Sequence, residues 1–352
     1  MANSASVLAT PRSLQRRVLK GLCWTVVGVG AAYALWLAWR DASLADLPAD
    51  LAFGPLGVSI ALRLAATLLT VSVWLGLYRG LGGAVGTVDG FRIYLLTNLG
   101  KYLPGKVMHA AGRVAMLRER GQPASIGVTS IALELVISLL AAAIVSVVSI
   151  PLLLQNQGLG GYATIMGWLA ALAVPLGLIS LHPSMIGLVL RLAARVMPSA
   201  SRPHSRQLPS YPRILLLLGM YTVVWVLGSF ALFAAARSVY PLDAAWLPAM
   251  GGIAALSYVA GVAVPFAPAG LGAREGLMTL LLSTMMPAPA AAVAAVLYRL
   301  VSVLAELTAA GLTMLLGLRR PATALTVAPA APLLQVKGGA TEASVSTGRG
   351  LP

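Results

Sequence analysis

Side chains that can carry positive charge cluster around a helix-breaking pair in a chain that is otherwise strongly apolar. The pair is Pro104-Gly105, and it interrupts a hydrophobic segment over residues 90–120. The flanking groups are Lys101, Lys106, His109 and Arg113. Glycine lets backbone approach a ligand, and a helix that restarts after a break presents free N–H groups. The pattern predicts a phosphate site, although cations beside a membrane also contact anionic lipid without specificity.

A second break lies at a corresponding place in the second half of the chain. It contains Pro268, Gly270 and Gly272, and Arg274 and Glu275 follow directly. Interrupted hydrophobic segments in matching positions of two halves are the best sequence pointer to the binding site of a membrane transporter. We therefore expect a ligand to enter at one break and leave at the other, with Arg113 and Arg274 binding its phosphate at the two ends.

Four further charged residues lie within apolar stretches. They are Arg63, Glu134, Arg299 and Glu306. An unpaired charge at the centre of a bilayer costs at least about 2.5–3.5 kcal/mol, so each of these side chains must face protein or water. We expect Glu134 to pair with Arg299, and Arg63 to pair with Glu306 or Glu134. The pattern leaves open whether these charges form structural ion pairs or line a pathway.

The composition defines the class of protein. Of 352 residues, 59% are hydrophobic and 10% are charged, and the mean hydropathy of +0.87 excludes an ordinary soluble domain. The net charge of +15 lies in loops beside membrane spans, where it orients the chain, so we expect no nucleic-acid partner. One cysteine, three scattered histidines and the lack of a nucleotide-binding loop predict no metal site and no cofactor.

The hydropathy pattern predicts an all-α polytopic membrane protein with about six full transmembrane helices and two broken, re-entrant helical hairpins. The expected full spans are residues 18–39, 53–78, 123–154, 163–181, 214–236 and 287–318. The hairpins are residues 90–120 and 244–286. Residues 1–17 form a basic cytoplasmic tail and residues 18–320 an integral membrane domain. Residues 321–352 form a disordered cytoplasmic tail, because their composition cannot bury a core.

The basic residues predict an orientation. Threading the chain through these spans puts most of its 25 lysines and arginines on one side, which the positive-inside rule assigns to the cytoplasm together with both termini. The first break then lies on the cytoplasmic side and the second on the outer side. Repeats at approximately residues 90–181 and 214–318 would therefore be inverted. The proline of each break precedes a buried charge, Glu134 or Arg299, by nearly the same spacing.

The two break motifs carry a resemblance to a known family. Residues 98–107 (NLGKYLPGKV) with Gly112-Arg113, and residues 268–276 (PAGLGAREG), resemble the flippase-like membrane region of bacterial lysylphosphatidylglycerol synthases. In that family the membrane region is taken to move a phospholipid between leaflets, through two inverted repeats with re-entrant segments. The resemblance implies a lipid pathway in the bacterial inner membrane lined by Lys106, Arg113, Arg274 and Glu275.

Two departures from the family pattern bear on activity. The full synthases carry a large soluble aminoacyl-transferase domain after the membrane region, whereas this chain continues into a short low-complexity segment, so we expect it not to aminoacylate lipid. Met108-His109 stand where better-known members tend to place a glycine and an acidic residue. The headgroup preference therefore stays open.

The leading hypothesis is a lipid flippase or translocase, a transporter rather than an enzyme. It would move an anionic phospholipid or a polyprenyl-phosphate-linked lipid across the cytoplasmic membrane. One alternative is a membrane-embedded lipid-headgroup transferase with Glu134 or Glu306 as general base. Another is a non-catalytic scaffold of a lipid or polysaccharide assembly complex. A separate lipid-modifying enzyme or glycosyltransferase is a candidate partner, and the sequence does not set the oligomeric state.

Overall fold

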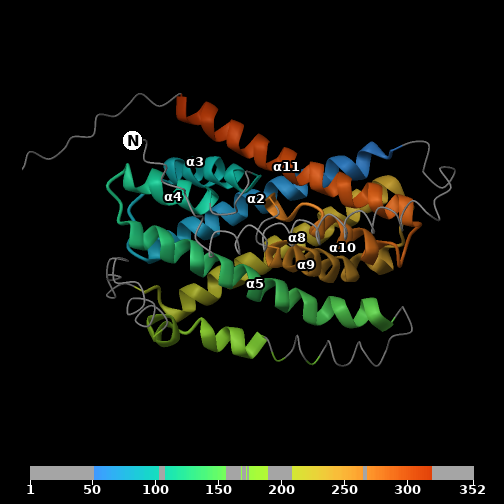
Figure 1. The fold of residues 1–352 in the computed structure, drawn as a ribbon, viewed down its shortest axis with the longest axis horizontal. Coiled ribbons are helices and arrows are strands. Elements are labelled where there is room, and N and C mark those ends of the chain that lie inside the picture. The colour runs from blue at the N-terminus through green and yellow to red at the C-terminus, as the bar shows by residue number, and fades with distance from the viewer. Residues whose placement is uncertain are drawn as a thin grey trace, which may run out of the picture.

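The computed structural model describes residues 51–102, 108–155, 208–264 and 268–318, together with residues 168, 172 and 174–188. Within these ranges the chain is helical and contains no β-strand. Figure 1 shows long helices that run roughly along the longest axis, with shorter helices set among them. Helices suit a chain in lipid, because each satisfies its backbone N–H and C=O groups within one segment.

Five helices of the described chain are long and apolar enough to cross a membrane. They are α2 (Phe53–Gly80), α5 (Ala124–Gln155), α8 (Tyr211–Val239), α9 (Leu247–Ala263) and α11 (Ala288–Leu318). Proline stands in the first turn of α8 and of α9, where its missing N–H breaks no helical hydrogen bond. The prediction of an all-helical, multi-pass membrane protein is confirmed.

The number of spans differs in its details from the prediction. Four of the six predicted spans correspond to α2, α5, α8 and α11. The span predicted at residues 18–39 lies outside the described residues, and about half of the one at residues 163–181 does. The remaining candidate, residues 244–263, was expected as the first arm of the second broken hairpin. Its 20 residues rise about 30 Å as a helix, which matches the hydrocarbon thickness of a bilayer.

Three shorter helices flank the two predicted breaks. They are α3 (Thr87–Asn98), α4 (Met108–Arg118) and α10 (Ala273–Leu282). Their 12, 11 and 10 residues fall well short of the roughly 20 that a span needs. Short 3-10 turns accompany them, η2 (Leu99–Tyr102), η3 (Ala244–Trp246) and η4 (Pro268–Gly270), and η2 contacts η4. In Figure 1, α3 and α4 lie toward one end of the long axis and α10 toward the other. Pro104 and Gly105 lie outside the described residues.

The chain turns sharply just before α10, because three residues there adopt positive φ angles. These are Ala269 at 49°, Gly270 at 73° and Gly272 at 84°. A side-chain carbon added at Gly270 would lie 2.7 Å from the Cα atom of Gly261, so the backbones of η4 and α9 can touch only without that carbon. The break predicted at Pro268, Gly270 and Gly272 falls on this turn.

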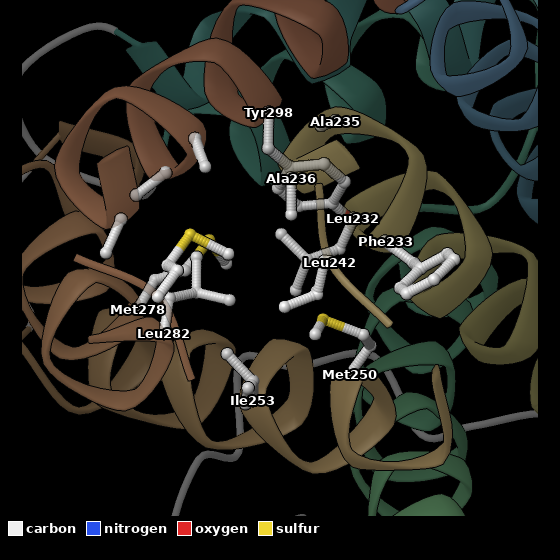
Figure 2. Packing of buried hydrophobic residues seen from close by; sticks show 14 of the residues in the cluster. Leu232, Phe233, Ala235, Ala236, Leu242, Met250, Ile253, Met278, Leu282 and Tyr298 are labelled. Carbon is white, nitrogen blue, oxygen red and sulfur yellow. The ribbon is translucent and has the colours of Figure 1, made fainter. Parts of the chain in front are cut away.

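Three clusters of buried apolar side chains pack the helices together, and two of them hold the short helices against the long ones. The largest joins α8, α9, α10 and α11, and Figure 2 shows Leu232, Met250, Met278 and Tyr298 of these four helices around a common core. A second cluster joins α2, α5 and α8. The third packs α3 against α2 and α11 around Trp74, which is fully buried. Each break therefore lies beside packed helices, which fix the positions of the neighbouring side chains.

Candidate functional site

A cavity of about 410 Å³ lies between the two breaks, and η2, η4 and most of the longer helices contribute to its wall. It collects these predicted site residues: Arg63, Lys101, His109, Arg113, Glu134, Arg274, Arg299 and Glu306. Glu275 stands just outside the wall and contacts Arg299. Lys106 lies outside the described residues. Charges from six different helices and turns thus meet in one space inside the bundle.

The first ion pair joins α4 to α5. Nη1 of Arg113 donates to Oε2 of Glu134 at 2.8 Å, and Arg113 is only 2% exposed. Its guanidinium lies 3.9 Å from the ring centroid of Tyr94 and 5.0 Å from that of Trp74. The Tyr94 hydroxyl donates to Oε1 of Glu134 at 2.5 Å. Both carboxylate oxygens are therefore bonded, as a buried charge requires.

The second ion pair links the first break to the last long helix. Nζ of Lys101, in η2, donates to Oε1 of Glu306 at 2.6 Å, and the Tyr102 hydroxyl donates to Oε2 at 3.1 Å. The two charged residues are 205 positions apart in the chain. Lys101 belongs to none of the five candidate spans. Burial away from water lowers the pKa of its ammonium group, and the Glu306 carboxylate opposes that shift.

The third ion pair stabilises the second break. Nε of Arg299 lies 3.4 Å from Oε1 of Glu275, and its Nη2 donates to the carbonyl of Ala269 at 3.2 Å. The Gly272 N–H donates to Oε2 of Glu275 at 2.8 Å. Glu275 thus occupies the N-terminus of α10 and accepts from a backbone N–H group there. Arg299 holds the turn that contains the positive φ angle of Ala269.

The expected pairing of the buried charges is wrong. Glu134 pairs with Arg113 instead of Arg299, and Arg299 pairs with Glu275. Over the described ranges, Arg63 forms an ion pair with neither Glu134 nor Glu306. The prediction considered partners on long helices alone, whereas α4, η2 and α10 place their charges closer to the glutamates and to Arg299.

Two arginines at the cavity have no carboxylate partner in the part of the chain that the structure describes. They are Arg63 on α2 and Arg274 on α10. Nε of Arg63 is buried and has no hydrogen-bond acceptor. Each guanidinium faces an aromatic ring instead, at 5.6 Å from the centroid of Tyr298 for Arg63 and 6.0 Å from that of Tyr258 for Arg274. The cavity therefore carries a surplus of positive charge.

Aromatic side chains form a part of the site that was not predicted from the sequence. Tyr94, Tyr102, Tyr221, Tyr258 and Tyr298 line the cavity together with Trp225. Half of the chain's ten tyrosines thus gather there. Tyrosines inside apolar segments are the signal that could have identified them, because a buried hydroxyl needs a hydrogen-bond partner. The rings of Tyr94, Tyr102, Tyr258 and Tyr298 lie near cations, and three of the tyrosine hydroxyls bond Glu134 or Glu306.

The chemistry of the cavity is that of anion binding. Guanidinium and ammonium groups bind phosphate or carboxylate oxygens. Within the described ranges, no group of three or more histidine, cysteine or acidic side chains could hold a metal ion.

The fold and the cavity define a multi-pass α-helical membrane protein that holds charged side chains inside its helical bundle. The model of the family described as Lysylphosphatidylglycerol synthase TM region matches residues 24–311. The chain belongs to this family, and the resemblance of its two break motifs is thereby confirmed. Membership indicates a function connected with membrane lipids. No curated protein sequence matches the chain.

Proposed function

We propose that the chain is a lipid translocase of the bacterial cytoplasmic membrane. It moves an anionic phospholipid or a polyprenyl-phosphate-linked lipid between the leaflets. The observation that carries the proposal is the surplus positive charge of the cavity. Among the described residues, Arg63 and Arg274 have no carboxylate partner, although each nearby glutamate has a cation. An unpaired cation within a membrane is costly, and a phosphate headgroup is the counter-ion that guanidinium groups bind best.

The two breaks support a pair of inverted repeats. The order α3, η2, α4, α5 in the first half has its counterpart in α9, η4, α10, α11 in the second. In both halves a charge on the short helix pairs with the long helix that follows, as Arg113 with Glu134 and Glu275 with Arg299, with the signs exchanged. The short helices lie toward opposite ends of the bundle (Figure 1). In this proposal each break is re-entrant and opens to one leaflet, and both termini and the first break lie on the cytoplasmic side.

The Arg113–Glu134 and Lys101–Glu306 ion pairs have different roles in the proposed transport of lipid. Arg113 is buried and bonded on α4, so it holds the first break in place, whereas Lys101 lies half-buried at the cavity. The contact of Lys101 with Glu306 joins the two halves. Alternating access requires such halves to separate on one side at a time. Lys101 therefore exchanges Glu306 for the lipid phosphate when the halves move, while Arg63 and Arg274 hold the headgroup.

A reconstitution assay tests the proposal. Purified protein is placed in liposomes with a fluorescent anionic phospholipid, and a reductant that cannot cross the membrane reports the lipid of the outer leaflet over time. We expect the protein to raise the flip rate and Arg274→Gln to lower it about tenfold, because one charge-assisted contact is lost. Arg237→Gln is the matched control, since Arg237 is exposed at the end of α8 and does not line the cavity. The proposal fails if the protein leaves the flip rate unchanged.

The same liposomes separate translocation from the two alternatives. Mass spectrometry of the lipids shows unchanged masses after translocation, whereas a headgroup transferase alters them. A scaffold keeps its cellular function when Lys101 and Glu306 are both made neutral, because only the balance of charge matters to it. A translocase loses function in that double variant, because Lys101 is one of the groups that bind the headgroup.

A further inference from the structure

The number of unpaired charges at the cavity bears on the kind of headgroup it binds. Five lysine and arginine residues line it, and their charges are counted against those of the carboxylates nearby. The basic residues are Arg63, Lys101, Arg113, Arg274 and Arg299. The carboxylates are Glu134 and Glu306 in the wall and Glu275 beside Arg299, each of which forms one ion pair. Over the described residues, two positive charges are left without a partner.

A ligand with two negative charges neutralises this surplus, whereas a ligand with one leaves a cation unpaired. A phosphodiester, the linkage of most phospholipid headgroups, carries one charge. A terminal phosphomonoester carries about −1.5 to −2 near neutral pH and offers three strong acceptor oxygens. A diphosphate also carries at least two charges. Both have enough oxygens to receive the two guanidinium forks of Arg63 and Arg274.

The wall of the cavity favours a lipid over a free phosphate ion. Leu135 on α5 and Val262 on α9 line it together with the charges, and they are 42% and 38% exposed. Both side chains therefore offer exposed apolar surface at the cavity wall, on two helices that pack against each other. The wall thus combines cationic side chains with apolar ones. An amphiphile matches both kinds of surface, with its phosphate on the cations and its chains on the apolar side chains.

We infer that the cavity binds a lipid whose headgroup presents a doubly charged phosphate, a terminal phosphomonoester or a diphosphate, in preference to a phosphodiester lipid. This inference rests on the proposed function, in which the cavity receives an anionic lipid headgroup. It adds the charge state of the phosphate as the basis of selection. Arg63 and Arg274 are the residues that determine the selection.

Equilibrium binding with a matched pair of ligands tests the inference. The full chain is placed in phosphatidylcholine nanodiscs and titrated by calorimetry with short-chain phosphatidic acid and with short-chain phosphatidylmethanol. These lipids differ in one methyl group, which blocks the second charge of the phosphate. At a pH well above the second phosphate pKa of about 6, we expect phosphatidic acid to bind about tenfold more tightly. Inorganic phosphate alone is expected to bind much more weakly than either lipid.

Variants of the two arginines show whether they cause the preference. Arg63→Gln and Arg274→Gln should each bring the ratio of the two affinities close to one, while phosphatidylmethanol still binds and thus reports an intact cavity. Arg237→Gln, outside the cavity, should keep the tenfold ratio. Equal affinity of the wild-type protein for both lipids overturns the inference, as does an unchanged ratio in both cavity variants. Inorganic phosphate binding as tightly as phosphatidic acid overturns the choice of a lipid.

Failure of the inference and failure of the proposed function give different results. If both short-chain lipids bind equally and fluorescent phospholipid still crosses in a manner that depends on Arg274, the selection by charge is wrong and the translocase stands. If the protein neither binds lipid phosphate nor raises the flip rate, both proposals are wrong.

Discussion

Replacement of Glu134 by glutamine tests how much the deepest ion pair contributes to the fold. The substitution keeps the size of the side chain and removes the charge that neutralises Arg113. Arg113 is 2% exposed and packs against Tyr94 and Trp74, so it cannot move to water without breaking the third apolar cluster. Breaking a buried pair on one side leaves a buried charge uncompensated, which costs about 3–5 kcal/mol. We expect Glu134→Gln to lower the free energy of unfolding by about that amount.

The measurement is unfolding of the purified protein in mixed micelles, followed by tryptophan fluorescence, as a double-mutant cycle. Arg113→Gln is the second single variant, and the double variant should cost less than the sum of the two, because neither charge is then left alone. The surface pair of Arg120 and Asp89 is the matched control. Its charged atoms are 3.9 Å apart and its side chains are 31% and 56% exposed. Asp89→Asn should therefore change the free energy of unfolding by less than about 1 kcal/mol.

The result that would refute this reasoning is a small effect at the buried pair. If Glu134→Gln costs no more than Asp89→Asn, the carboxylate does not compensate Arg113, and water or another group must do so. Additive effects in the cycle would lead to the same conclusion.

Two further predictions concern the second break and the contact between the halves. Gly270→Ala should lower the free energy of unfolding by more than about 1 kcal/mol, because φ is 73° there and the new carbon would lie 2.7 Å from Gly261. Gly57→Ala is its control, since Gly57 has open space in a long helix and should be neutral or stabilising in the same unfolding assay. Lys101→Glu and Glu306→Lys should each lower the flip rate in liposomes, and the double swap should restore it in part, because the ion pair can form again with its charges exchanged. A double swap as inactive as the single variants would contradict the proposed role of this pair in holding the halves together.

Several features of the fold could be predicted because they depend on each residue and its near neighbours. A run of apolar residues long enough for a bilayer specifies a span by its length, and α2, α5, α8 and α11 follow the predicted segments closely. The second break could also be located, since a proline with several glycines interrupts a helix locally. The first arm of that hairpin, residues 244–263, leads directly into the break, so the pattern predicts one interrupted segment there instead of a separate span.

The partners of the buried charges could not be predicted, because they depend on how helices cross. Lys101 meets Glu306 across 205 positions, whereas the sequence pattern predicts a phosphate ligand for Lys101 and Arg63 as a partner for Glu306. The tyrosines that line the cavity come from α3, η2, α8, α9 and α11, and nothing in their spacing relates them. The packing of short helices on the apolar clusters decides which side chains meet.

The sequence by itself determined that this chain spans a membrane and that its few interior charges must face protein or water. The reason is energetic, because a charge in apolar surroundings carries its desolvation cost wherever the chain places it. Only the tertiary structure decided which charges neutralise one another and which two arginines are left over. That choice depends on distances of 2.6–3.4 Å between side chains on separate helices, which the crossing of those helices sets.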